Sequence, residues 1–424
     1  MIDIYLLREN PSLFEKSYTR MKRPELLTQF KELVEKDKQL RLIQNSLDRL
    51  RSQKNILTQE INTLRKAGKS IDIALNKMKD LPAEVKIKEE EYASVFERVQ
   101  ELVKTLPNII HEKVPYGEND KNNVEIKKWG KIKKFDFPVK THVEILEALD
   151  AVDFDASARV TGNGFYYLKG DFALLNQALL QFVIEHMIKK KYVYIEPPLM
   201  LKKDVLFRSI DPKAFEQSVY CVEGEDTCLI GTSEYSLLAM YSDKIIVELP
   251  KKYFSYTMCF RKEVGAHGIN ERGLWRTHQF NKVEQFIFCK PEESWKFYDE
   301  LLKNTEEVFQ ALELPYRVIE ICTGDLAVWK ARSADIEVWR PTTQTYGEVV
   351  SLSNCTDYQA RSLNIRYEEK GERKVVHTLN NTAIATSRAL VAIVEHYQQK
   401  DGSIAIPKVL QKYMGGKKVI TKSS

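Results

Sequence analysis

The sequence lacks the short motifs that most directly assign a binding site. Its six cysteines are scattered and form no Cys-x-x-Cys pair, which argues against a zinc ribbon. We therefore expect unpaired thiols in a reducing compartment, and no zinc. The chain also has no GxGxxG turn and no GxxxxGK[ST] loop, so a nucleotide site would need another way of binding phosphate.

Long apolar stretches and a strong net charge are also missing. No stretch reaches the length of a membrane span, and the first residues, MIDIYLLRENPSLF, lack the basic start and apolar run of a signal peptide. The 65 Lys and Arg residues nearly balance 60 Asp and Glu residues, which leaves a net charge of +5. We expect a cytoplasmic protein with no membrane partner. Its 424 residues, 43% of them hydrophobic, allow two or three domains.

Glycine is almost absent between residues 26 and 106, where Gly68 is the only one. Apolar residues recur there every seven positions, and the two main stripes are Leu33, Leu40, Leu47, Ile61 and Met78, Val85, Tyr92, Val99, Leu106. Two heptad stripes on either side of a glycine predict an antiparallel coiled-coil hairpin, with arms of about 35 residues and roughly 50 Å. Pro82 should kink the second arm or mark a helix restart.

The predicted hairpin has a basic tip and an acidic root. Residues 38–88 contain 12 Lys/Arg and 5 Asp/Glu residues, whereas 28–37 and 89–106 together contain 4 Lys/Arg and 8 Asp/Glu residues. A solvated coiled coil is one interpretation of such a charged hairpin. The polarity favours contact with a phosphate backbone, because Lys and Arg gain affinity there by releasing condensed counterions.

The remainder of the chain predicts an α+β fold. A linker follows the hairpin, and short β-rich runs then alternate with amphipathic helices such as Leu174–Lys189 and Trp295–Leu312. Successive strand-like runs are close enough in sequence to pair antiparallel. We predict an N-terminal domain at 1–110 and a second domain at 111–424, with a mostly antiparallel sheet flanked by helices.

Two predicted strands, Tyr253–Val264 and Thr277–Phe288, have charged residues where Val or Thr would be usual. Alternation places Arg261 and Glu263 on one face of the first strand, opposite Met258 and Phe260, which we expect to face the core. The loop between the strands contains Gly265, Gly268 and Gly273 and could move over a ligand.

In the second strand, Arg276, Phe280 and Glu284 share one face. Arginine suits phosphate or carboxylate oxygens, a phenyl ring can stack on a base, and glutamate can accept a hydrogen bond from an amine. A zwitterion together with a nucleoside triphosphate would satisfy this set of groups. The alternative is an exposed sheet face with cross-strand ion pairs.

Two later segments add candidate residues. Glu348 and Ser351 could offer oxygen ligands to Mg²⁺, although a Glu-x-x-Ser pair alone is a weak signal. The segment from His377 through Thr382 leads to Arg388 near a helix start, which suggests anion binding. A capped helix with a surface arginine is the alternative.

These segments together resemble the class II aminoacyl-tRNA synthetases, and specifically the seryl-tRNA synthetase family. The resemblance covers the hairpin, the linker LPNIIHEKVPYGENDKNNVEIKKWG and the three class II motifs, which are KKKYVYIEPPLM, FRKE with RTHQFNKVEQF, and LNNTAIATSRALVAIVEHYQ. The signals similar to seryl-specific ones are the Thr232-Ser233-Glu234 triplet, the KVEQF run and SNCTDYQAR at 353–361. The chain departs from the family at Lys191, where the first motif usually has glycine, and at Ser362, where a second arginine is common.

The resemblance implies roles for the ATP-binding positions. Arg261 is similar to the arginine that contacts the α-phosphate and the amino acid carboxylate, and Arg261 and Arg388 are the implied catalytic residues. Glu263 matches the residue that reads the adenine amino group, and Phe280 matches the ring that stacks on adenine. The other implied ATP contacts are Arg276, Thr277 and Arg388, and the implied Mg²⁺ ligands are Glu348 and Ser351.

The resemblance also implies a serine pocket. Thr232, Ser233 and Glu234 correspond to the side that faces the amino group, and Arg261 to the carboxylate contact. Glu284 would contact serine, and Thr382 would lie near its hydroxyl.

The implied reaction is the ATP-dependent attachment of L-serine to tRNA(Ser) through seryl-adenylate, with tRNA(Sec) as an additional substrate left open. The resemblance implies that the hairpin binds tRNA and that the chain forms a homodimer. One alternative is an inactive RNA-binding paralogue, which the presence of Arg261, Glu348 and Arg388 disfavours. The other is an amino acid ligase for a carrier protein, which the long arm disfavours.

Overall fold

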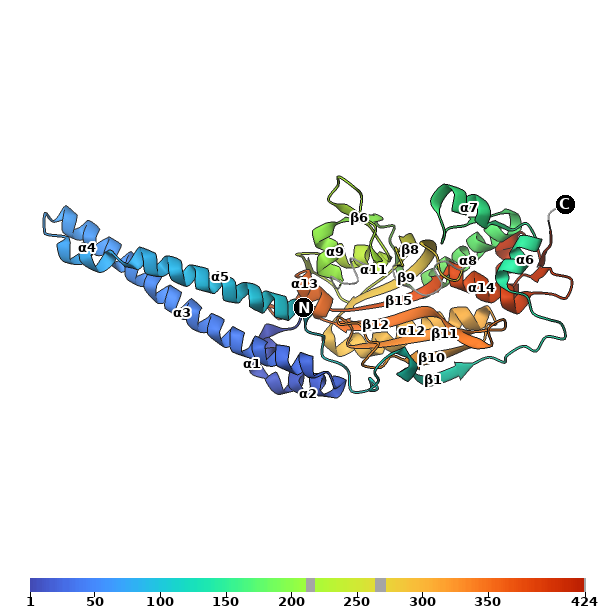
Figure 1. The fold of residues 1–424 in the computed structure, drawn as a ribbon, viewed down its shortest axis with the longest axis horizontal. Coiled ribbons are helices and arrows are strands. Elements are labelled where there is room, and N and C mark those ends of the chain that lie inside the picture. Colours follow the sequence, from blue (N-terminus) through green and yellow to red (C-terminus); the bar gives the residue numbers. More distant parts are fainter. Residues whose placement is uncertain (211–217, 264–271, 423–424) are drawn as a thin grey trace. The chain divides into compact units, whose positions relative to one another are not determined.

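The computed structural model describes residues 1–210, 218–263 and 272–422. The chain forms two compact units, Met1–Ile109 and Ile110–Ser424 (Figure 1). Within those described ranges, no helix is both long enough and apolar enough to cross a membrane. Gly265 and Gly268 of the predicted moving loop lie outside the described residues.

The N-terminal unit contains the predicted helical hairpin. After α1 (Ile4–Glu9) and α2 (Pro11–Met21), α3 (Pro24–Lys66) continues for 43 residues, which corresponds to about 65 Å. The chain reverses after it, and α5 (Leu81–Thr105) runs back along α3 (Figure 1). Gly68 has φ +63° in the reversal, a left-handed conformation that glycine adopts without steric cost.

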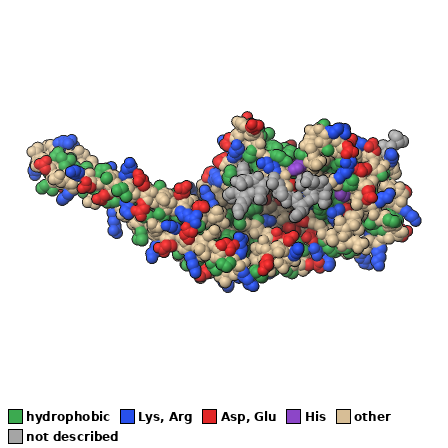
Figure 2. All heavy atoms as spheres, in the orientation of Figure 1, with side chains coloured by type: hydrophobic (Ala, Val, Ile, Leu, Met, Phe, Trp, Pro, Cys, Tyr) green, Lys and Arg blue, Asp and Glu red, His purple; other side chains and the backbone are tan. Residues whose placement is uncertain are grey.

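The heptad residues form the apolar seam of this hairpin. Among them, Leu33, Leu40, Leu47, Ile61, Val85, Val99 and Leu106 are buried. The second arm is interrupted, because α4 (Asp72–Met78) ends before α5 begins with Pro82 in its first turn. Pro82 therefore marks a helix restart, a position where its missing N–H costs no hydrogen bond. Figure 2 shows Lys and Arg side chains spread along the hairpin, with acidic side chains among them.

The second unit is built on an eight-stranded sheet with the strand order β1-β10-β11-β12-β15-β9-β8-β4. In that order the strands are Val124–Trp129, Tyr316–Glu320, Arg332–Arg340, Thr345–Thr356, His377–Ala385, Gln279–Cys289, Lys251–Phe260 and Val193–Tyr194. All neighbouring pairs are antiparallel except β4 and β8, which pair in parallel. The α+β prediction with a mostly antiparallel sheet is confirmed.

Three helices, α8 (Gly170–Lys189), α12 (Ser294–Ala311) and α14 (Thr386–Tyr397), contribute to the main hydrophobic core with the sheet. Because successive strand residues point to opposite faces, β9 directs Val283 and Ile287 into this core. Phe286 and Phe288 point the other way, into a smaller cluster with α11 (Ser233–Ala239). The site lies among polar residues on this second face of β9.

Shorter elements complete the second unit. The helices are α6 (His142–Ala148), α7 (Phe154–Thr161), α9 (Lys203–Ser209) and α13 (Tyr358–Ser362), with 3₁₀ turns at Asp120–Asn122, Pro291–Glu293 and Lys408–Met414. The short strands are β2 (Val152–Asp153), β3 (Tyr167–Leu168), β5 (Met200–Lys202), β6 (Thr227–Leu229), β7 (Ile245–Ile246), β13 (Arg366–Glu369), β14 (Glu372–Val375), β16 (Ile404–Ala405) and β17 (Val419–Ile420).

Lys191 occupies the position after α8 where the family usually has glycine. It has φ +63°, and the next residue, Tyr192, donates its backbone N–H to the Met187 carbonyl. This is the hydrogen bond of a helix C-terminal cap that favours glycine. The lysine therefore keeps the conformation that the turn requires and bears its steric cost.

Candidate active site

The two charged strands are shorter than predicted. β8 ends at Phe260 and β9 begins at Gln279, so Arg261, Glu263 and Arg276 lie in the segments at the strand ends. Glu263 has φ +52°, a conformation that non-glycine residues rarely adopt and that cannot continue a strand. Its carboxylate lies 2.5 Å from Nη1 of Arg276. Backbone strain of this kind is concentrated at functional sites.

The face of β8 that we assigned to the core does face it, because Phe254 belongs to the main core cluster and Tyr256 packs against it. Met258 and Phe260 are partly exposed, whereas Thr257 and Cys259 are buried. Near the end of the strand, the side of Thr257 and Cys259 is therefore more deeply buried than the side of Met258 and Phe260.

A cavity of about 570 Å³ opens at this face, within the size range of small-molecule sites. The predicted residues that line it are Thr232, Glu234, Arg261, Glu263, Arg276, Thr277, Phe280, Glu284, Glu348, Ser351, Thr382 and Arg388. Ser233 does not line the cavity, and its side chain is buried. Residues that are distant in sequence meet here because β8, β9, β15 and β12 are successive neighbours in the sheet.

One end of the cavity holds two arginines with restrained guanidinium groups. Arg261 donates from Nε to the Gly231 carbonyl at 3.1 Å, and its guanidinium carbon lies 5.3 Å from the centre of the Phe280 ring. Arg388 donates from Nη1 to the Glu348 backbone oxygen at 2.8 Å and from Nε to the Trp275 carbonyl at 3.3 Å. Positioned guanidinium groups beside an aromatic ring suit phosphates attached to a planar base.

Oxygen atoms gather on β12 at the same end. Glu348 has its Oε2 3.1 Å from Nη1 of Arg388. Desolvation raises the pKa of Glu348, but the charge and hydrogen bond of Arg388 together with the charges of Arg261 and Lys330 outweigh it, so the pKa lies below its ordinary value. Ser351 pairs across the sheet with Asp335, whose Oδ1 is buried without a hydrogen-bond partner in the described part of the chain. Carboxylate and hydroxyl oxygens of this kind fit a hard cation such as Mg²⁺.

The other end of the cavity holds two buried carboxylates. Glu284 accepts hydrogen bonds from Thr382 Oγ1 at 3.1 Å and from Asn380 Nδ2 at 3.1 Å. Glu234 accepts from the same Asn380 Nδ2 at 3.0 Å and from Gln359 Nε2 at 2.7 Å. Burial raises the pKa of Glu234, and the nearby charge of Glu284 raises it further.

Three residues of this end were missed from the sequence. Lys282 lies between Thr232 and Glu284, with its Nζ 2.6 Å from Thr232 Oγ1 and 2.7 Å from Glu284 Oε2. Alternation placed Lys282 on the same face as Glu284 but gave it no role, and the same alternation could have placed Asn380 beside Thr382. Gln359 lies on the short helix α13, and no periodic pattern pointed to it.

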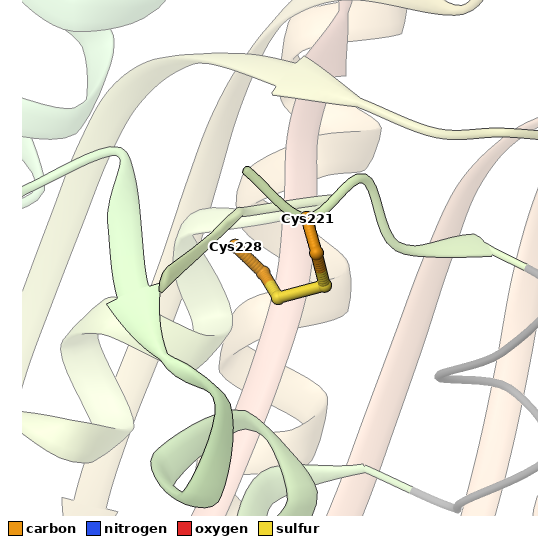
Figure 3. Close-up of a disulfide and its surroundings, with 2 residues drawn as sticks. All are labelled: Cys221 and Cys228. Carbon is orange, nitrogen blue, oxygen red and sulfur yellow. A yellow bond between two sulfur atoms is a disulfide. The ribbon is translucent and has the colours of Figure 1, made fainter. Parts of the chain in front are cut away.

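Two of the six cysteines form a disulfide, so the expectation of unpaired thiols was wrong for them. Cys221 and Cys228 lie opposite each other in an antiparallel bridge and are joined through their sulfurs (Figure 3). The chain reversal between Cys221 and Cys228 brings the two residues together, and their spacing of seven residues in the sequence does not by itself predict a disulfide. The residues just before this disulfide-linked chain reversal border the cavity, because Ser218 and Val219 line the cavity wall.

Comparison with known proteins identifies the family. Residues 219–397 match the tRNA synthetase class II core domain (G, H, P, S and T), and residues 1–110 match the seryl-tRNA synthetase N-terminal domain. The serine–tRNA ligase of Methanocella arvoryzae is 44% identical over 98% of this chain and 99% of its own length.

Two solved structures also match over almost the full length. The seryl-tRNA synthetase from Pyrococcus horikoshii, complexed with ATP, has a TM-score of 0.94 and 39% identity, covering 100% of both chains. The cytoplasmic serine–tRNA ligase from Naegleria fowleri, in complex with AMP, has a TM-score of 0.90 and 32% identity, covering 100% of this chain and 99% of that one. The chain therefore belongs to the seryl-tRNA synthetases, the class II aminoacyl-tRNA synthetases that act as serine–tRNA ligases.

Proposed function

We propose that the cavity forms seryl-adenylate and that its two ends divide the substrates by charge. The observation that supports this division is that two sets of contacts share one cavity: Arg261 lies against Phe280, and Glu234 and Glu284 share the Asn380 amide. Phosphates and a carboxylate belong at the cationic end. An ammonium group and a hydroxyl belong at the end with carboxylate acceptors.

In the first step, the serine carboxylate attacks the α-phosphate of ATP in line, and pyrophosphate leaves. The carboxylate is already ionised at neutral pH, so no general base is required. Arg261 contacts the α-phosphate and the serine carboxylate, and Arg388 contacts the leaving pyrophosphate. Catalysis then rests on positioning and charge neutralisation. The 3′-hydroxyl of the terminal tRNA ribose next attacks the carbonyl carbon of seryl-adenylate, so that the ester forms, the acyl-phosphate bond breaks and AMP leaves with the hydroxyl proton released.

The remaining ATP contacts hold the base and the outer phosphates. Phe280 stacks on adenine, and Glu263 accepts from its amino group. Arg276 and Thr277, where β9 begins, contact the phosphate side. Glu348 and Ser351 would hold Mg²⁺, which when bound neutralises phosphate charge and orients the triphosphate.

Serine is selected by hydrogen bonding. Thr232 and Glu234 face the ammonium group, and Glu284 and Thr382 face the hydroxyl. Ser233 contributes through its backbone at the start of α11, because its side chain lies behind the wall. Alanine leaves the buried partners of the hydroxyl unsatisfied and is rejected for that reason.

The N-terminal unit is proposed as the tRNA(Ser)-binding domain, and residues 111–424 as the catalytic domain. The basic tip of the hairpin supports contact with folded RNA, which proteins read largely by shape and backbone. Serylation of tRNA(Sec) is proposed only as a possible extension of the same contact. A cytoplasmic location follows from this role in tRNA charging.

A homodimer is supported by apolar side chains in and around the first class II motif. The exposed ones are Ile188, Val193, Tyr194, Leu199, Met200 and Phe207. They extend from the end of α8 across β4, an edge strand of the large sheet. Exposed large apolar side chains gathered in one segment are typical of a protein interface. Sedimentation equilibrium should give twice the monomer mass, and a concentration-independent monomer would contradict the proposal.

ATP–pyrophosphate exchange measured with each of the twenty amino acids tests the site. We expect exchange with serine, none with alanine, and loss of exchange when Mg²⁺ is chelated. Serine-independent exchange, or full exchange without divalent cation, would contradict the assigned roles. The Arg261→Ala and Arg388→Ala variants should lower kcat and leave the fold unchanged by circular dichroism.

A further inference from the structure

The serine end of the cavity contains a buried cation to which the roles above assign no function. Lys282 and Glu284 lie two residues apart on β9, so both side chains point to the same face. The Lys282 side chain is 6% exposed and that of Glu284 is 1% exposed. Lys282 Nζ lies 2.7 Å from Glu284 Oε2 and donates to Thr232 Oγ1 at 2.6 Å. The ammonium group therefore bridges the two sides of the proposed serine pocket.

The charges in this pocket are balanced in a way that matches the substrate. Two cations, Arg261 and Lys282, and two carboxylates, Glu234 and Glu284, are the charged residues of the cavity wall assigned here to the amino acid. A free amino acid brings one further charge of each sign. If Arg261 pairs with the carboxylate of the amino acid and Glu234 pairs with the ammonium group of the amino acid, Lys282 remains to neutralise the charge of Glu284. Glu348, Arg388 and Lys330 also line the cavity; Lys330 donates to Ser351 Oγ at 3.3 Å, and its charge acts on Glu234 as well as on Glu348.

Hydrogen bonds hold Glu284 in this arrangement. Thr382 Oγ1 donates to the same Oε2 atom that faces Lys282, and Asn380 Nδ2 donates to Oε1. Because Asn380 also donates to Glu234, the two carboxylates are kept apart at a fixed spacing. Glu284 thus has a fixed orientation and a neutralised charge, which suits the acceptor of an uncharged hydroxyl.

We propose that Lys282 is the specificity-determining positioning residue of the serine pocket: by neutralising Glu284 it makes the pocket accept a side-chain hydroxyl and reject a side-chain ammonium. This inference rests on the proposed serine pocket. Without Lys282, the carboxylate of Glu284 has no cation beside it in an enclosed site, where a charge without a partner is costly. An amino acid with an ammonium group in place of the serine hydroxyl would then supply the missing charge.

The discriminating substrate is L-2,3-diaminopropionate, which has an amine where serine has its hydroxyl and the same number of side-chain heavy atoms. ATP–pyrophosphate exchange is measured with serine and with diaminopropionate for the wild type, Lys282→Met, Lys282→Arg and the double variant Lys282→Met/Glu284→Gln. We expect Lys282→Met to raise the ratio of kcat/KM for diaminopropionate to that for serine by about tenfold or more. Lys282→Arg keeps the cation and should keep the wild-type ratio.

The double variant separates charge from packing. Glu284→Gln removes the charge that Lys282 neutralises, so the preference for diaminopropionate should disappear again when both are changed. Lys290→Met is the matched control, because it breaks the ion pair with Glu369 (2.6 Å) outside the cavity, and it should leave the ratio unchanged. If Lys282→Met fails to fold by circular dichroism, Lys282→Gln, which keeps a donor for Glu284, replaces it.

A proportional loss of both activities in the folded variant, with no change in the ratio, would refute the proposal and reduce Lys282 to a structural residue. A double variant that keeps the diaminopropionate preference would also refute it, because no uncompensated carboxylate remains there. Failure of the wild type to exchange with serine would instead contradict the proposed serine pocket.

Discussion

Replacing Glu284 by alanine should separate serine binding from ATP binding. In the proposed complex, the serine hydroxyl donates to a carboxylate, and a hydrogen bond to a charged group contributes about 1.5–3 kcal/mol. Its loss should raise KM for serine, or lower kcat/KM, by roughly 10- to 150-fold. The ATP end should be preserved, because Arg261 and Phe280 have no hydrogen bond to Glu284. KM for ATP should change by less than about threefold.

The same change has a cost in stability that can be worked from the structure. Glu284 is 1% exposed and pairs with Lys282 at 2.7 Å. Removing one partner of a buried pair leaves an uncompensated charge and costs about 3–5 kcal/mol. The free energy of unfolding, measured by urea denaturation, should fall by an amount in that range.

The assay is ATP–pyrophosphate exchange with serine and ATP varied separately. Glu306→Ala is the matched control: its carboxylate is also buried and also pairs with a lysine, Lys127, at 2.7 Å, but it does not line the cavity. The Glu306→Ala variant should have a lower free energy of unfolding than the wild type and an unchanged KM for serine. An unchanged KM and kcat for serine in Glu284→Ala would refute the assignment of Glu284 to the serine pocket.

Three further predictions follow from other parts of the chain. Deleting residues 30–104 should leave ATP–pyrophosphate exchange intact and lower tRNA(Ser) charging by about two orders of magnitude, as expected when ~3 kcal/mol of RNA contacts is lost; equal charging by the shortened protein would contradict the role of the arm. Because burial, and then Glu284, raise the pKa of Glu234, protonation at lower pH should remove the partner of the substrate ammonium. KM for serine should therefore rise as the pH is lowered, Glu234→Gln should flatten this profile at a higher KM, and a flat wild-type profile would count against it. Lys191→Gly should raise the free energy of unfolding by about 1 kcal/mol, because glycine adopts the left-handed conformation without strain; a lower melting temperature would show that the lysine side chain contributes more than its backbone costs.

The local features of the fold were predictable in detail. The heptad stripes, the reversal at Gly68 and the restart at Pro82 all agree with the structure, because each depends on neighbours within a few helical turns. The alternation along β9 also placed Phe280 and Glu284 correctly on one face. The prediction from alternation failed at Arg261 and Glu263, because β8 ends before them and a pattern of charges does not show that Glu263 has a positive φ.

The candidate site was predictable as a set of residue types and not as a set of contacts. The resemblance to the family implied roles for Arg261, Arg388, Glu348 and Ser351, whereas the residue patterns alone only suggested an anion site and a weak cation site. Gln359 was not found, because its hydrogen bond to Glu234 joins positions 125 residues apart and no local pattern encodes such a pair. The Cys221–Cys228 bridge was missed because its formation depends on how a short hairpin closes.

The sequence by itself determined the helical arm, the α+β class and the family, because periodicity, composition and motif order are properties of the chain read in one dimension. The tertiary structure alone decided which charges face each other in the proposed serine pocket. Lys282 could have been an exposed lysine on a sheet face, and Glu234 an exposed residue of a short helix. In the folded chain both side chains are buried, because strand pairing and the packing of α11 exclude water from around them. In such a setting charges interact strongly, so the partner of each charge determines what the pocket can bind.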